Sequence, residues 1–105
     1  EKILNVKGRF CGDPKRIVRS IGMIGGAGGS DVQAAFDAGC DVLLTGEMKH
    51  NQALLSEHLG LNCCVMGHCE TEFPVLKPLI SRLQNENNDV QYVLTHSGRA
   101  PLRCL

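Results

Sequence analysis

The chain has 105 residues, of which 43% are apolar and 21% are charged, and its 11 basic residues balance its 11 acidic ones. This size and composition indicate one soluble globular domain, and the few aromatic residues (three Phe and one Tyr) imply an aliphatic core. The balanced charge disfavours a nucleic-acid-binding protein, and no apolar run approaches the roughly 20 residues of a membrane span, so we exclude a membrane protein.

The first predicted elements are a short strand at 3–7 and a second strand at 16–25, which is rich in Ile, Val and Met and ends in a run of glycines. Ser30 is the expected N-cap of a short helix, with Gln33 completing a capping box. Gly39 is the expected end of that helix.

The middle of the chain alternates between apolar runs and a helical pattern, with glycines at each break. Residues 41–45 and 61–66 are nearly continuous apolar runs, which are typical of strands covered on both faces. Residues 48–59 between them predict a helix.

The last predicted elements begin at Thr71, the expected cap of a helix whose apolar residues recur at helical spacing. Pro78 lies inside this pattern and is expected to kink or restart the helix. A polar loop at 85–89 precedes a predicted strand at 90–95, and the tail at 98–105 is expected to be irregular.

This alternation predicts the α/β class: a three-layer-like βαβαβαβ unit with a largely parallel or mixed sheet, in one domain over residues 1–105. In such sheets, sites form beyond the carboxyl ends of the strands. Three predicted strand ends carry chemically useful residues, at 25–30, 45–50 and 67–72.

The glycine turn at 25–30 offers backbone N–H groups, so Gly28, Gly29 and Ser30 are candidates for holding an anion. Neither the dinucleotide-binding fingerprint nor the phosphate-binding GxxxxGK[ST] motif is present. A tight strand-to-helix turn explains the same glycines, and both interpretations stay open.

His68 and Glu72 are four residues apart, a spacing that places both side chains on one side of a strand-to-helix corner. An imidazole and a carboxylate are ordinary ligands for zinc, iron or manganese, so these two residues are the candidate metal ligands. A capping histidine beside a solvated acid is the alternative. A thiolate site built from Cys63, Cys64 and Cys69 with His68 is disfavoured, because successive strand residues point to opposite faces.

Glu47 and His50 are three residues apart at a predicted helix start, so they are candidates for contacting the substrate or supporting the metal ligands. Lys49 between them is a candidate partner for an anionic substrate group. An ordinary exposed first turn with favourable acidic charge explains this segment as well.

Six cysteines without a CxxC pair, together with the absence of a visible secretory signal, favour free thiols in a reducing compartment. We therefore expect a cytoplasmic protein. Charge is uneven along the chain, since residues 1–20 carry a net charge of +4 and residues 31–72 a net charge of −6. The basic segment leaves a weak phosphate-contact interpretation open beside that of a solvated edge.

Three segments in order, at 25–30, 38–50 and 67–72, resemble the carboxy-terminal half of the Ngg-interacting-factor-three family, also called GTP cyclohydrolase I type 2 homologues. The resemblance implies a longer protein with a dinuclear divalent-metal centre. It places His68 and Glu72 among the ligands, with the remaining ligands supplied by a missing amino-terminal half.

The resemblance further implies a homo-oligomer, a hexamer in full-length relatives, with metal-dependent hydrolysis of a nucleotide-like or phosphorylated small molecule. The present chain alone is expected to be inactive. Two positions depart from the family pattern: Asn51 follows His50 where paired histidines are frequent, and Cys69 stands where an aromatic residue is frequent. A protein-interaction or scaffold role with a structural metal is the alternative function, and a stand-alone anion-binding domain is a third.

Overall fold

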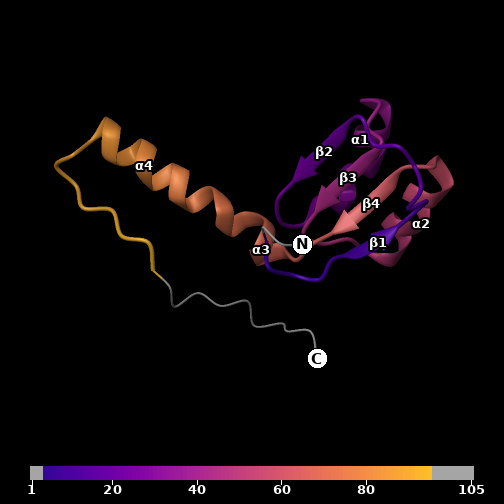
Figure 1. The fold of residues 1–105 in the computed structure, drawn as a ribbon, viewed down its shortest axis with the longest axis horizontal. Helices are drawn as coiled ribbons and strands as arrows, with labels where there is room; N and C mark the ends of the chain where they lie inside the picture. Colours follow the sequence, from indigo (N-terminus) through magenta and orange to yellow (C-terminus); the bar gives the residue numbers. More distant parts are fainter. Residues whose placement is uncertain (1–3, 96–105) are drawn as a thin grey trace.

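The structure is a computed structural model that describes residues 4–95. Its fold is built on a four-stranded mixed sheet (Figure 1). The strands are β1 (Arg9–Cys11), β2 (Ile21–Ile24), β3 (Val42–Thr45) and β4 (Asn62–Val65), arranged in the order β1-β4-β3-β2. Strands β2, β3 and β4 are parallel, whereas β1 pairs antiparallel with β4. The predicted α/β class and the mixed sheet are confirmed.

The helices follow the strands along the chain, as the alternation of apolar runs predicts. After β2 come the 3₁₀ turn η1 (Gly28–Asp31) and α1 (Val32–Asp37), and after β3 comes α2 (His50–Leu59). After β4 come α3 (His68–Glu72), the 3₁₀ turn η2 (Phe73–Val75) and α4 (Leu76–Glu86).

The core lies between the sheet and helices α1 and α2. Its largest fully buried apolar side chains are Leu43 on β3, Val32 on α1 and Leu61 just before β4. On the other face of the sheet, Ile21 and Met23 are 57% and 71% exposed. Within residues 4–95, α1 and α2 therefore supply one covered face, and the second helical layer of a three-layer arrangement is not formed over β2.

The first strand is not at 3–7 as predicted. Residue 3 lies outside the described residues, residues 4–7 are not a strand, and β1 begins at Arg9. Its register, with Phe10 opposite Cys64, is set by the free edge of β4. The prediction was wrong because it rested on the apolar residues of the segment itself. The edge of β4 decides which residues pair with it.

Two local predictions around β2 are also wrong. The strand begins at Ile21 and not at residue 16, because the backbone N–H groups of Arg19 and Ser20 donate to the carboxylate of Asp41 and not to a neighbouring strand. The Ser30–Gln33 capping box does not form. Asp31 is the N-cap of α1, and the Ser30 hydroxyl donates to its carboxylate.

The chain after β4 departs further from expectation. The helix that Thr71 was expected to cap starts earlier, at His68, so Thr71 lies inside α3. The restart expected at Pro78 is confirmed, because α4 begins at Leu76 after η2 and the proline lies in its first turn.

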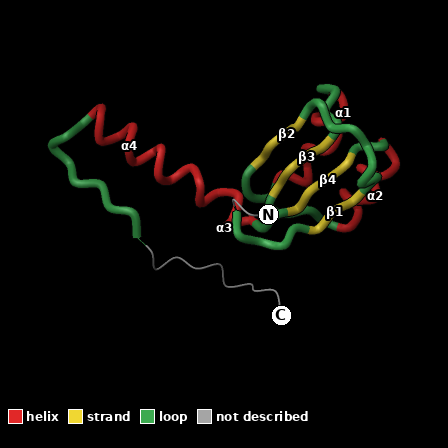
Figure 2. Tube along the Cα trace, in the orientation of Figure 1, coloured by secondary structure: helices red, strands yellow, loops and turns green. Residues whose placement is uncertain are grey.

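Residues 90–95 were predicted to form a strand and do not. Figure 2 shows α4 and residues 87–95 running to one side of the sheet, and no residue of α4 is buried. The apolar run at 90–95 therefore meets no sheet edge with which to pair. Among residues 4–95, no helix is both long and apolar enough to cross a membrane.

Candidate functional site

The ends of β2, β3 and β4 meet at one edge of the sheet, as the predicted topology requires. The carbonyl of Gly26, just after β2, accepts hydrogen bonds from the N–H groups of Gly46 and Glu47, both at 2.9 Å, just after β3. The N–H of Gly67, after β4, donates to the Gly46 carbonyl at 3.1 Å. Backbone hydrogen bonds thus hold the turns after β2, β3 and β4 against one another.

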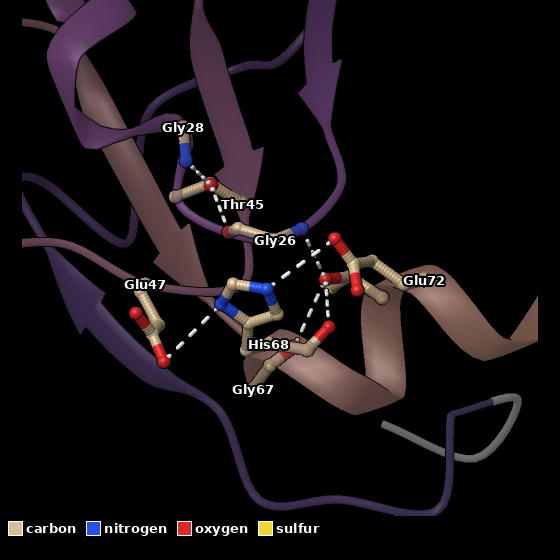
Figure 3. A network of polar contacts seen from close by, with 8 residues as sticks. Gly26, Gly28, Thr45, Glu47, Gly67, His68 and Glu72 are labelled. Atoms are coloured by element: carbon tan, nitrogen blue, oxygen red, sulfur yellow. Dashed lines mark hydrogen bonds and ion pairs between the residues drawn. The ribbon is translucent and has the colours of Figure 1, made fainter.

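The hydroxyl groups of two threonines add hydrogen bonds to this junction of the three turns. The fully buried Thr45 hydroxyl accepts from the Gly28 N–H at 2.8 Å and donates to the Gly26 carbonyl at 3.1 Å (Figure 3). The Thr71 hydroxyl accepts from the Gly26 N–H at 3.0 Å and lies 2.9 Å from the Gly67 carbonyl, to which it can donate. Sequence analysis assigned Thr45 no role, although a polar residue ending a buried apolar run is a signal for such a bond.

The imidazole of His68 lies between two carboxyl groups, as Figure 3 shows. Its Nε2 is 3.3 Å from Oε1 of Glu72, and its Nδ1 is 3.3 Å from Oε1 of Glu47. The i, i+4 spacing therefore brings the two predicted ligands together. Glu47 arrives from a different turn, and it supplies the oxygen neighbour of His68 that the sequence leaves unnamed.

This arrangement fits either an imidazolium, whose two N–H groups donate to both carboxylates, or a neutral imidazole with a cation next to Nε2. A neutral imidazole has one N–H, so it can donate to only one of the two flanking carboxylates. If the Nδ1–H of the neutral ring faces Glu47, the Nε2 lone pair faces a carboxylate oxygen of Glu72. A cation between these two atoms would remove their electrostatic repulsion. Two donors at about 2.1 Å from one tetrahedral zinc ion would lie about 3.4 Å apart, close to the observed 3.3 Å.

The stability that these contacts give the fold is small. The side chains of His68, Glu47 and Glu72 are 46%, 53% and 56% exposed. Exposed ion pairs contribute at most about 1 kcal/mol, so the stability of the fold does not depend on this arrangement.

Gly26 leaves the space next to His68 and Glu72 open. A Cβ on this residue would lie 2.5 Å from Oε1 of Glu72 and 3.0 Å from Nε2 of His68, and its φ of +67° favours glycine. The close approach of the backbone to both candidate ligands therefore requires a residue without a side chain here.

Beside this junction is a cleft of about 840 Å³, to which all three strand ends contribute. Glu47 and His68 line it, as do Gly29 and Ser30 from the predicted anion cradle. Other lining residues that sequence analysis did not assign to a site are Lys7, Arg9 and Glu70. Lys7 and Arg9, before and within β1, reach the cleft only because that strand pairs with β4.

Three predicted site residues, Gly28, His50 and Glu72, do not line the cleft. The N–H of Gly28 is engaged with Thr45 and, at 3.2 Å, with the Gly26 carbonyl. His50, the first residue of α2, is exposed.

The cysteines of the described chain are free thiols, as expected, and burial raises the pKa of both Cys63 and Cys64. Over residues 4–95, no group of three or more His, Cys, Asp or Glu side chains is placed to hold a metal ion. His68 and Glu72 are thus a pair of donors from one corner of the backbone.

The family model for Duf34/NIF3 (NGG1p interacting factor 3) matches residues 1–101. The chain belongs to this family. Curated relatives are named "GTP cyclohydrolase 1 type 2 homolog". The one from Clostridium perfringens is 26% identical over 94 residues, covering 89% of this chain and 36% of the relative. The one from Deinococcus radiodurans is 31% identical over 91 residues, covering 82% and 34%.

Two solved structures share the fold. A Bacillus cereus protein related to NIF3 superposes with a TM-score of 0.78 at 27% identity, covering 97% of this chain and 29% of that one. A Staphylococcus aureus hypothetical protein gives a TM-score of 0.73 at 32% identity, covering 82% and 29%. The chain therefore spans about a third of the length of these four proteins.

Proposed function

We propose that this chain is the metal-binding part of a dinuclear-metal protein, a metal-dependent hydrolase acting on a nucleotide-like or phosphorylated small molecule. The observation that carries the proposal is the placement of His68 between Glu72 and Glu47, with 3.3 Å from each ring nitrogen to a carboxylate oxygen. The relatives' name, GTP cyclohydrolase 1 type 2 homolog, supports a nucleotide-like substrate.

In this proposal each residue has a defined part. His68 Nε2 and Glu72 Oε1 hold the divalent cation, which is zinc, iron or manganese. Glu47 accepts the Nδ1–H of His68, which orients the ring and raises its basicity as a ligand. Cations bound here would act as Lewis acids on a substrate oxygen and activate water near neutral pH.

Two donors do not complete a metal site, because catalytic zinc sites use three protein ligands. The remaining ligands and the second ion's site must therefore come from outside residues 4–95. A longer protein fits this requirement, since the chain spans about a third of its relatives. The homo-oligomer implied by the resemblance remains a prediction, which light scattering on the longer protein checks.

Metal content tests the ligand assignment. The chain extended by its natural upstream sequence is purified, and bound zinc, iron and manganese are measured by elemental analysis for wild type, His68→Ala, Glu72→Gln and Glu47→Gln. We expect loss of metal in the first two variants and a fall of about 10- to 100-fold in affinity in the third.

His58→Ala is the matched control, because His58 is an exposed histidine near the end of α2 and does not line the cleft. It should retain the wild-type metal content. Unchanged metal in both His68→Ala and Glu72→Gln would defeat the proposal.

A scaffold with a structural metal is the second candidate. The exposed apolar side chains Val75 and Leu79, 58% and 45% accessible at η2 and α4, favour a surface that contacts another protein. Nucleotide hydrolysis that is lost on chelation supports the enzyme. Partner binding that survives loss of His68 and Glu72 supports the scaffold.

A further inference from the structure

We propose that Lys7, Arg9 and Lys49 form a phosphate-binding wall of the cleft beside His68, and that its ligand is a phosphate ester of mononucleotide size. The assignment deepens the proposed function by naming how the substrate's charged end is held. Binding through this wall does not itself require the metal, so the two can fail separately.

The antiparallel direction of β1 brings two of these cations to the site. Because β1 runs opposite to β4, its start lies beside the end of β4, and Arg9 is directly opposite Val65. Residue 65 lies three positions before His68. Lys7 and Arg9 therefore reach the edge where the three parallel strands end, and both line the cleft.

The register also determines which face of the sheet Arg9 occupies. Cys11, two residues on and so on the same face, places its Sγ 3.4 Å from the Ser56 hydroxyl of α2. Arg9 therefore lies on the side of the sheet that α2 covers. The start of α2 is at the same edge, because this helix follows the end of β3.

Lys49 enters the cleft from that helix start. Its backbone N–H donates to Oε1 of Gln52 at 2.8 Å, which holds the residue immediately before α2, and both residues line the cleft. Cations from β1 and from the start of α2 thus converge on one cavity, although they are about 40 residues apart in the chain.

The charges of this wall lack partners within the part of the chain that the structure describes. None of Lys7, Arg9 and Lys49 has a carboxylate within 4.0 Å there, whereas the ion pairs that do form use Arg16, Arg82 and His68. The cleft's two acidic residues are Glu47, which faces His68, and Glu70. Three unpaired cations in one cavity favour a ligand that carries at least two negative charges, which is the charge of a phosphate monoester.

The rest of the cleft favours an ester over free phosphate. Its volume, about 840 Å³, far exceeds that of a phosphate ion and lies in the range of pockets for organic ligands. Val6, Met48 and Val65 add apolar surface to its lining, against which an organic group can pack. A ligand with a dianionic end and an organic body of nucleoside size satisfies both parts of the cavity.

Calorimetric titration of the 105-residue chain in the presence of a chelator tests this proposal. The probes are a nucleoside monophosphate, its parent nucleoside and inorganic phosphate. We expect saturable binding of the monophosphate, with at least about tenfold weaker binding for the other two. The double variant Arg9→Gln, Lys49→Gln should bind the monophosphate at least about tenfold more weakly, and raised salt should weaken wild-type binding.

Lys77→Gln is the matched control, because Lys77 is an exposed lysine of α4 and its loss changes the net charge without touching the cleft. It should bind like wild type, and circular dichroism should show the same fold for all variants. No binding to wild type, an equal loss in Lys77→Gln, or equally tight binding of nucleoside or inorganic phosphate would overturn the proposal. In the longer protein, the double variant should keep the wild-type metal content. A loss of phosphate binding without a loss of metal distinguishes this proposal from the metal assignment.

Discussion

Replacing Gly26 by alanine tests whether the glycine turn exists to leave space for the two candidate metal ligands. The residue is buried, has a φ of +67°, and its carbonyl accepts hydrogen bonds from Gly46 and Glu47. Gly26→Ala therefore changes the backbone's conformational preference and adds one methyl group directly beside His68 and Glu72.

Gly26→Ala is expected to change two quantities, the free energy of unfolding and the affinity for metal. Holding alanine in the left-handed conformation costs about 1–2 kcal/mol of unfolding free energy. The added Cβ would lie 2.5 Å from Oε1 of Glu72, but this carboxylate is at the end of a flexible side chain that is 56% exposed. Glu72 can turn away at little cost to stability, and that movement separates it from Nε2 of His68. We therefore expect about 1–2 kcal/mol lower stability together with at least about tenfold weaker metal binding.

Urea denaturation and zinc titration measure the two quantities, with Gly25→Ala as the control. A Cβ on Gly25 would meet its nearest neighbours at 3.5–3.8 Å, which is ordinary contact, and its φ is not positive. This variant should stay within about 0.5 kcal/mol of wild type and keep its metal affinity. Equal behaviour of the two variants, or full metal affinity in Gly26→Ala, would refute the reasoning.

Three further outcomes follow from the structure. Leu43→Ala should lower the free energy of unfolding, measured in urea, by about 2–5 kcal/mol, because the side chain is fully buried. Leu79→Ala on α4, where the side chain is exposed, should lower it by less than about 1 kcal/mol. Equal losses would show that the core is misassigned. Hydrogen bonds from the backbone N–H groups before β2 hold the pKa of Asp41 below its ordinary value, so the stability that it contributes should be lost as pH falls below about 4, and Asp41→Asn should remove that part of the pH dependence. Burial raises the pKa of the Cys63 thiol, so iodoacetamide at pH 8 should leave it unmodified in the native protein and label it after unfolding, as mass spectrometry would show; rapid native labelling would contradict its position.

Several features of the fold follow from the sequence because they depend on neighbours along the chain. The apolar runs at 41–45 and 61–66 correspond to β3 and β4, within one residue at each end. The helix predicted at 48–59 ends at Gly60, whose φ of +70° closes it. The same local logic places His68 and Glu72 together, since a spacing of four residues on one helical turn needs no distant partner.

Predictions that depend on distant partners failed or could not be made. The segment at 90–95 has a strand's composition but no strand beside it, and the first strand lies at Arg9–Cys11 because the edge of β4 selects it. Thr71 looks like a helix cap, yet its hydroxyl accepts a hydrogen bond from the Gly26 N–H, 45 residues away.

The sequence alone therefore determined the alternating α/β pattern, the family and the two candidate ligands that share one turn. The tertiary structure decided that Glu47 faces the second nitrogen of His68, and that Arg9 and Lys49 line the same cleft. The physical reason is that backbone preference and side-chain periodicity act over a few residues. Which carbonyl, carboxylate or strand edge comes to lie opposite a given group is set only when the sheet assembles.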